Sequence, residues 1–204
     1  MGAMTEPESE PAPEPLSDRL QAWLAADGTK SLGALVTAFG PQSFAILFVV
    51  LMAFPALPLP TGGVSHVLEI ATMLLSAELV VGRQTVWLPR RLADRELRAL
   101  DGKLAHALVR RIRWFEKHSK PRFAHLLGWR ATGSVIGLIV LGLTIAAFVA
   151  PPFSGLDTLP SLGVVVLSLG MLLGDVLVAL VGVAIGAVGV GLVLVLGRAV
   201  LHLV

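Results

Sequence analysis

The chain has 204 residues, of which 55% are hydrophobic and only 15% are charged, and its mean hydropathy is +0.81. A chain of this composition cannot present an ordinary polar surface to water, so it is predicted to be an integral membrane protein. The formal net charge is only +2, and the lack of cysteine excludes disulfides and thiolate metal ligands.

Residues 1–15 form an acidic, proline-rich tail without the apolar core of a signal peptide, and we expect it to be disordered. In residues 16–40, leucines and aromatic residues recur at helical spacing on either side of Asp27 and Gly28. These pieces are too short and polar to span. They are predicted to be amphipathic interfacial helices, with Trp23 at headgroup depth. A soluble amphipathic hairpin packed on the rest is the alternative.

Residues 41–82 form the first predicted membrane unit. Its first apolar run ends at Phe54 and would be about 20 Å long as a helix, short of the roughly 30 Å hydrocarbon core. The second run, from Val64 to Gly82, would reach about 28 Å. The unit is therefore either a tilted hairpin or a re-entrant one. The break between the runs contains Pro55, Pro58, Pro60, Gly62 and Gly63.

This break organises the chain, because proline lacks an amide donor and glycine readily adopts positive φ, so helix cannot continue through it. The freed backbone groups then need protein or water around them, and irregular backbone at membrane depth is usually found where it lines a cavity.

Residues 83–130 hold 13 of the 16 Lys and Arg, and this segment is predicted to be cytoplasmic by the positive-inside rule. Leucines recur every three or four residues in it, which favours an amphipathic helix against anionic headgroups. A plain basic connector is the alternative, and the local basicity does not indicate nucleic acid.

Residues 131–175 form the second predicted membrane unit, and residues 176–204 a C-terminal transmembrane helix of sufficient length. The second unit is broken at Pro151, Pro152 and Gly155. Small residues line one face of the last helix and predict close packing against another helix. They are Ala179, Gly182, Gly186 and Gly189.

The two units resemble each other. A shift of 92 residues superposes Pro60 on Pro152 and Gly63 on Gly155 without gaps. These matches fall where backbone shape is decided, so the sequence predicts an internal repeat of helix, break and helix. The predicted fold is thus all-α: two such repeats, a C-terminal transmembrane helix and amphipathic interfacial helices.

A polar stripe follows each break. Four polar residues after the first break have the spacing of one helix face, and three of the four shifted positions are polar as well. His66 can pair with Glu69 three residues later, although it can equally be an interface residue. The candidate polar pathway comprises Ser65, His66, Glu69, Thr72, Ser76, Asp157, Ser161 and Ser168.

Ionisable groups in hydrocarbon are costly and usually face a cavity or a partner. The stripes therefore indicate either a substrate or ion pathway or structural hydrogen bonding between the repeats. The chain lacks a phosphate-binding loop, a zinc-protease motif and a nucleophile elbow, so we expect no cofactor, no metal and no catalytic residue of these kinds. Sparse intramembrane acids can still serve a membrane enzyme.

Four motifs carry a family resemblance over residues 16–204. They are Ser31-Leu32-Gly33-Ala34-Leu35, Phe54-Pro55-Ala56-Leu57-Pro58-Leu59-Pro60, Leu79-Val80-Val81-Gly82-Arg83 and Trp87-Leu88-Pro89-Arg90-Arg91. On these the chain resembles the exopolysaccharide synthesis ExoD family of bacterial inner-membrane proteins. It departs from the family pattern at Thr61-Gly62-Gly63, where the family often has a proline-glycine pair. The resemblance implies a link to surface polysaccharide and supplies no catalytic residues.

The expected function is support of exopolysaccharide synthesis or export from the bacterial inner membrane by a multi-pass protein that is not an enzyme. It would handle a lipid-linked intermediate or an ion through the polar pathway. The alternatives are a membrane enzyme acting on polyprenyl or phospholipid headgroups and a non-transporting scaffold. Expected partners are membrane lipids, a lipid-linked saccharide or ion, and a second copy or other synthesis proteins, without nucleic acid.

Overall fold

The computed structural model describes residues 15–26, 31–58, 63–87, 93–94, 109–110, 113, 117, 130–151 and 154–201. Within these residues the chain forms seven helices and no strand, which confirms the all-α prediction. The helices are α1 (Leu16–Ala25), α2 (Leu32–Phe39), α3 (Gln42–Met52), α4 (Gly63–Val80), α8 (Arg130–Val149), α9 (Thr158–Leu173) and α10 (Val176–Leu201). The predicted tail and most of the predicted basic linker lie outside the described residues.

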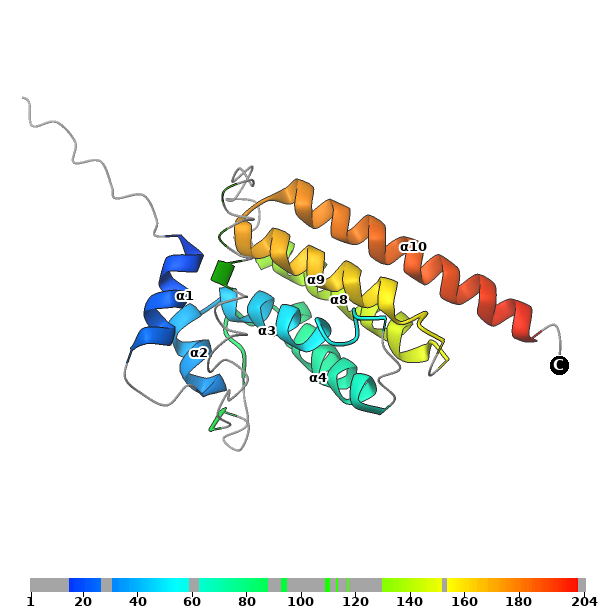
Figure 1. Ribbon diagram of the computed structural model, residues 1–204, viewed down its shortest axis with the longest axis horizontal. Coiled ribbons are helices and arrows are strands. Elements are labelled where there is room, and N and C mark those ends of the chain that lie inside the picture. Colours follow the sequence, from blue (N-terminus) through cyan, green and yellow to red (C-terminus); the bar gives the residue numbers. More distant parts are fainter. Residues whose placement is uncertain are drawn as a thin grey trace, which may run out of the picture.

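Four of these helices form a ring in which each packs on the next: α3 on α4, α4 on α8, α8 on α9, and α9 on α3 (Figure 1). Helices α4 and α9 therefore occupy opposite corners of the bundle, and the faces that they turn inward look toward each other. Helix α10 packs along the outside of α9 and also touches α8.

Both breaks lie at the same end of the bundle, away from α1 and α2 (Figure 1). The ring of His66 near the start of α4 lies 5.0 Å from that of Phe148 near the end of α8, which places these helices antiparallel. Helix α10 runs back toward the breaks, since Gly189 packs against Pro160 at the start of α9. The C-terminal end of α10 consequently lies at the break end.

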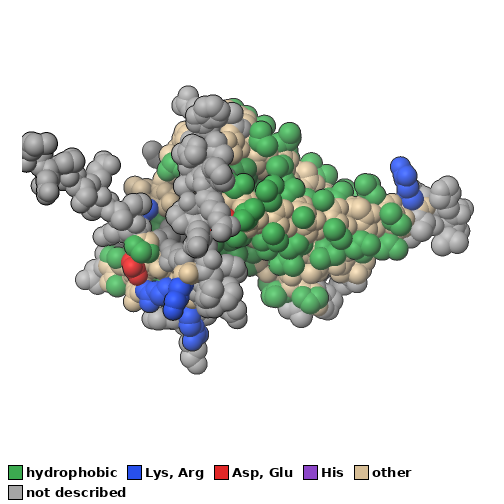
Figure 2. Space-filling model, turned by 90° about the horizontal axis from the view of Figure 1, so that it is seen from above, with side chains coloured by type: hydrophobic (Ala, Val, Ile, Leu, Met, Phe, Trp, Pro, Cys, Tyr) green, Lys and Arg blue, Asp and Glu red, His purple; other side chains and the backbone are tan. Residues whose placement is uncertain are grey.

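Three helical stretches are long and apolar enough to cross a membrane: Gly63–Val80, Thr132–Val149 and Val176–Leu196. Helices α3 and α9 are apolar but shorter. Hydrophobic side chains cover the flank of the bundle seen in Figure 2, whereas the charged side chains seen there gather near α1 and α2 and at the far end of α10. Such an apolar flank suits lipid and not water, so this is a membrane protein.

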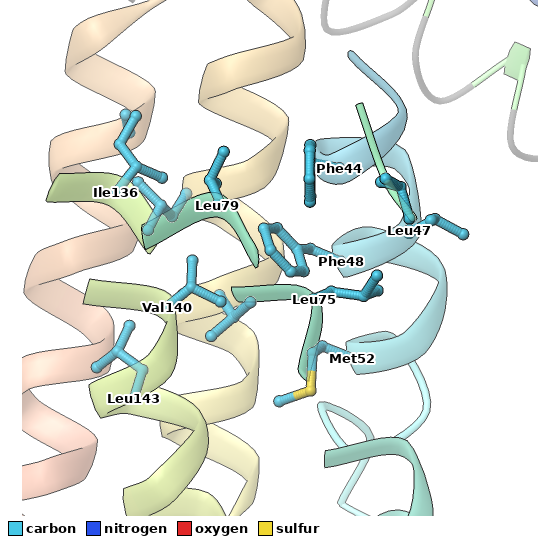
Figure 3. Close-up of a cluster of buried hydrophobic side chains, with 13 residues drawn as sticks. Phe44, Leu47, Phe48, Met52, Leu75, Leu79, Ile136, Val140 and Leu143 are labelled. Carbon is cyan, nitrogen blue, oxygen red and sulfur yellow. The ribbon is translucent and has the colours of Figure 1, made fainter. Parts of the chain in front are cut away.

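The bundle is held together by a core cluster to which α3 and α8 contribute most (Figure 3). Phe48 and Met52 of α3 and Val140 of α8 are completely buried in it. Burial of one such side chain stabilises a fold by roughly 1.5–3 kcal/mol in water. In a membrane this term is smaller, because lipid is itself apolar, and close packing matters more.

Helices α1 and α2 dock on the bundle end opposite the breaks. Leu20 and Phe39 are buried in a second cluster that includes residues of α3 and α9. Trp23 packs edge-on against Phe39 with ring centroids 6.2 Å apart, and the Arg19 guanidinium lies 5.5 Å from the Phe39 centroid. The pair is thus packed on the rest of the chain, and its position at a membrane interface stays a prediction.

Small residues bring α9 and α10 into backbone contact, as their spacing predicted. A Cβ added to Gly163 would lie 2.5 Å from the Cα of Gly186, and one added to Gly189 would lie 2.6 Å from the backbone N of Pro160. Gly174 has a different role, because its φ of +63° makes it the left-handed C-cap of α9.

The breaks agree in outline with the prediction. Helix α3 ends at Met52, and the Ala56 N–H donates to the Met52 carbonyl at 2.9 Å in the turn around the buried Pro55. The sequence pattern had placed Gly63 within the break, but in the structure it is the first residue of α4. Gly155 has a φ of +68°. Pro58 and Pro151 lie between the helices, whereas Pro60, Gly62 and Pro152 lie outside the described residues.

The arrangement makes a prediction about sidedness. Because the natural chain has no cysteine, Arg110→Cys, Ser154→Cys and Arg198→Cys can each be labelled without background. We expect a membrane-impermeant maleimide added to intact cells to label Ser154→Cys and Arg198→Cys but not Arg110→Cys, since the basic segment should stay cytoplasmic. Permeabilised cells should label all three. Labelling of Arg110→Cys from outside would reverse the orientation.

Candidate functional site

The polar stripe of α4 faces the interior of the bundle. Ser65, Glu69, Thr72 and Ser76 are each at most 1% exposed. On the outer side of the same helix, Leu74 is 66% exposed. Helix α4 is thus polar inside and apolar outside, which is the reverse of a helix in a soluble bundle.

Two hydroxyls of this stripe are satisfied by their own helix. The Thr72 hydroxyl donates to the Leu68 carbonyl at 2.9 Å, and the Ser76 hydroxyl donates to the Met73 carbonyl at the same distance. These bonds remove the cost of burying a hydroxyl without requiring a partner from another helix. The two side chains therefore line the interior without needing a ligand.

The stripe of α9 faces the same interior from the opposite corner. Val164 is completely buried in the main core cluster, and Ser161 and Ser168 lie three residues before and four after it, on the same helix face. Both serine hydroxyls are fully buried, and neither has a hydrogen-bond partner. Most buried polar groups in folded proteins are paired, so two unpaired hydroxyls on one face indicate capacity for a ligand or water.

Glu69 is the most unusual residue of the site. Its side chain is completely buried, and neither carboxyl oxygen has a hydrogen-bond partner. His66 Nδ1 lies 3.8 Å from Glu69 Oε2, beyond hydrogen-bond distance, and has no partner either. The structure thus brings His66 beside Glu69, as the spacing predicted, but the two side chains are too far apart to share a hydrogen bond.

Asp157 brings a second carboxyl to the same end of the bundle. It immediately precedes α9, where its side chain makes no capping hydrogen bond. Its carboxyl is near enough to interact electrostatically with that of Glu69. Two acids that lie 88 positions apart in the sequence therefore come within electrostatic reach of each other toward the end that carries both breaks.

The remaining acids of the bundle have local structural roles. The Asp175 carboxylate accepts the N–H of Leu177 at 2.9 Å and caps α10. The Glu78 carboxylate accepts the backbone N–H of Trp87 at 2.8 Å. These two acids are accounted for by the fold, which sets Glu69 apart.

Sequence reasoning missed one polar residue of the interior, Thr144 of α8. It is completely buried, and its hydroxyl donates to the Val140 carbonyl at 2.7 Å. The available signal was that Thr144 is the one hydrogen-bonding side chain in the apolar run from Val135 to Val149.

The site combines two carboxyls within electrostatic reach of each other, an imidazole and two unpaired hydroxyls. Such a set can hold a proton, a small cation or the polar headgroup of a larger ligand. Within the described ranges, no three His, Asp or Glu side chains are grouped so as to hold a metal ion.

The fold and the site define an all-helical membrane protein with a polar interior between apolar helices. The chain belongs to the exopolysaccharide synthesis ExoD family, whose sequence model matches residues 16–195. This confirms the family expected from the motifs.

Two relatives illustrate the reach of this similarity. Protein ExoD of Rhizobium meliloti is 28% identical over 166 residues, which cover 78% of this chain and 68% of that protein. An uncharacterized protein of Synechocystis sp. is 25% identical over 160 residues, which cover 76% of this chain and 74% of the relative. No solved structure matches the chain.

Proposed function

We propose that this protein supports exopolysaccharide synthesis or export as a multi-pass protein of the bacterial inner membrane. Its polar interior between α4 and α9 would handle either an ion or the headgroup of a lipid-linked saccharide. Membership of the ExoD family supports the link to polysaccharide. The buried carboxyls and unpaired hydroxyls of the interior support the handling of a polar ligand.

Glu69 is the observation that carries this proposal. Burying a carboxyl without hydrogen bonds costs several kcal/mol, and ionisable groups within membrane segments usually mark a ligand or ion site. Purely structural hydrogen bonding between the helices does not explain Glu69, because neither oxygen is bonded. A bound ion, proton or headgroup would supply the missing partner.

The arrangement of the two hairpins also suits this function. The hairpins α3–α4 and α8–α9 would be the two copies of the predicted repeat, related by an axis along the bundle as in transporters with parallel repeats. Their short helices α3 and α9 would be the ones that stop within the membrane. Glu69 and Asp157 would then lie toward the end of the bundle that carries the breaks. A ligand would enter there, from the side of the membrane opposite the basic segment.

The proposal is tested by removing charge while keeping shape. Glu69→Gln and Asp157→Asn should each reduce polysaccharide output at least tenfold per unit of inserted protein, because an amide cannot exchange a proton or neutralise a cation. Asp18→Asn is the matched control, since this exposed acid pairs with Arg113 at the other end of the molecule. Output should be measured beside the amount and monodispersity of extracted protein.

Normal output from the Glu69→Gln/Asp157→Asn double variant would reject the ligand-handling interior. The scaffold function would then be favoured, because a scaffold needs only the shape of the bundle.

A further inference from the structure

A groove of about 560 Å³ runs along the outside of the α3–α4 hairpin, distinct from the polar interior. Its volume lies within the range of small-molecule sites. Most of its lining is aliphatic and comes from α2, α3 and α4. These residues include Leu32, Leu47, Leu51, Ala71 and Leu74.

The groove is polar at one end only. Ala71, Leu74 and Glu78 follow one another along α4 over about 10 Å, toward the bundle end that carries α1 and α2, and Val81 lies just after the helix. The other polar lining residue, Arg83, comes just after the helix. A ligand that fits this groove must therefore have a long apolar part and a polar head at the α1–α2 end.

The polar end presents one cation and one anion. The Arg83 guanidinium lies 6.0 Å from the ring centroid of Trp87 and forms no ion pair with any acid in the described part of the chain. Glu78 is held in place by the Trp87 N–H, and this single bond leaves its carboxylate able to accept others. The two opposite charges thus face the groove without neutralising each other.

The apolar part of the groove needs a cover. Leu74 is 66% exposed, Val81 80% and Trp87 62%. Helix α4 is one of the helices able to cross a membrane, so its outer side lies against lipid chains. Trp87 and Arg83 have the character of residues at a membrane boundary.

We propose that this groove binds one acyl chain of a zwitterionic phosphoethanolamine lipid, with the phosphate on Arg83 and the ammonium on Glu78. The charge pattern selects this headgroup, because phosphatidylglycerol has the same phosphate for Arg83 but lacks an ammonium to pair with Glu78. The site lies outside the bundle interior and does not depend on the proposed function.

The test uses the purified, delipidated full chain and native mass spectrometry with phosphatidylethanolamine or phosphatidylglycerol. Arg83→Gln should weaken phosphatidylethanolamine binding by roughly tenfold, the effect of losing a charge-assisted hydrogen bond. Arg198→Gln, an exposed arginine at the far end of α10, is the matched control and should leave binding unchanged. Ala71→Phe should block the groove and reduce binding of both lipids.

Glu78→Gln separates the headgroups, since the amide oxygen can still accept the Trp87 N–H. Phosphatidylethanolamine binding should fall, whereas phosphatidylglycerol binding should hold or rise. Equal loss of both lipids in Glu78→Gln, or unchanged phosphatidylethanolamine binding in both Arg83→Gln and Ala71→Phe, would overturn the proposal.

A thermal melt in detergent identifies any variant that has lost its fold. If Ala71→Phe is such a variant, Leu74→Phe serves as a second groove-filling variant with the same expected result.

Discussion

Gly182→Ala should destabilise the folded protein by roughly 3 kcal/mol or more, the upper range of overpacking effects. The added Cβ would collide with the backbone of Leu167 and would lie 2.8 Å from the carbonyl oxygen of Gly163. Backbone atoms cannot turn aside as a side chain can, so α9 and α10 would have to separate. Separation would in turn remove the close contacts along the helix pair, which in a membrane are the main source of helix association.

Gly191→Ala is the matched control on the same helix, because a Cβ there would have no neighbour within 4 Å. It should be neutral or stabilising by up to about 1 kcal/mol, since alanine is the better helix former. The two substitutions are chemically identical, yet only Gly182→Ala should lower the melting temperature when thermal unfolding is followed in detergent. Similar melting temperatures for both variants would show that α9 and α10 do not pack as described.

Glu69→Met should raise the stability of the protein by about 2 kcal/mol while abolishing polysaccharide output. The carboxyl is buried without a hydrogen bond, and replacing such a group by an apolar side chain of similar volume removes its desolvation cost. Residues kept for function often carry a stability cost of this kind. Melting temperature and output should therefore move in opposite directions.

Glu78→Met on the same helix is the control, and only its stability is compared. It should lose stability, because the Trp87 N–H would then lack its acceptor. A lower melting temperature for Glu69→Met would mean that the carboxyl holds the bundle together, and the structural interpretation of the stripe would replace the functional one.

Much of the candidate site followed from local sequence pattern. The period of the helix alone places Ser65, Glu69, Thr72 and Ser76 on one face, and the structure confirms that this face is buried. The apolar residues on the outer faces follow from the same period. The prolines and glycines around Pro55 and Gly155 likewise predicted where the helix is interrupted. Proline lacks an amide donor and glycine readily adopts positive φ, and both properties belong to the residue itself.

Whether a polar side chain was free or already satisfied was decided only by the tertiary structure. Thr72 and Ser161 have the same character in the sequence, yet Thr72 bonds its own helix and Ser161 has no partner. Gly170 and Gly174 are four residues apart, yet Gly170 packs against the backbone of Ala179 and Gly174 is a left-handed cap. The difference lies in rotamers and backbone angles, which depend on neighbours that sequence spacing does not specify.

The sequence by itself determined that this is an all-helical membrane protein with two broken, apolar units and polar stripes, because composition and helical period are properties of the chain alone. Only the tertiary structure placed α4 and α9 at opposite corners of one ring and brought the Asp157 carboxyl within electrostatic reach of Glu69. The same packing left a groove beside α2, α3 and α4. Which helix faces which is set by the fit of side chains between helices, and that fit arises only when the whole bundle is assembled.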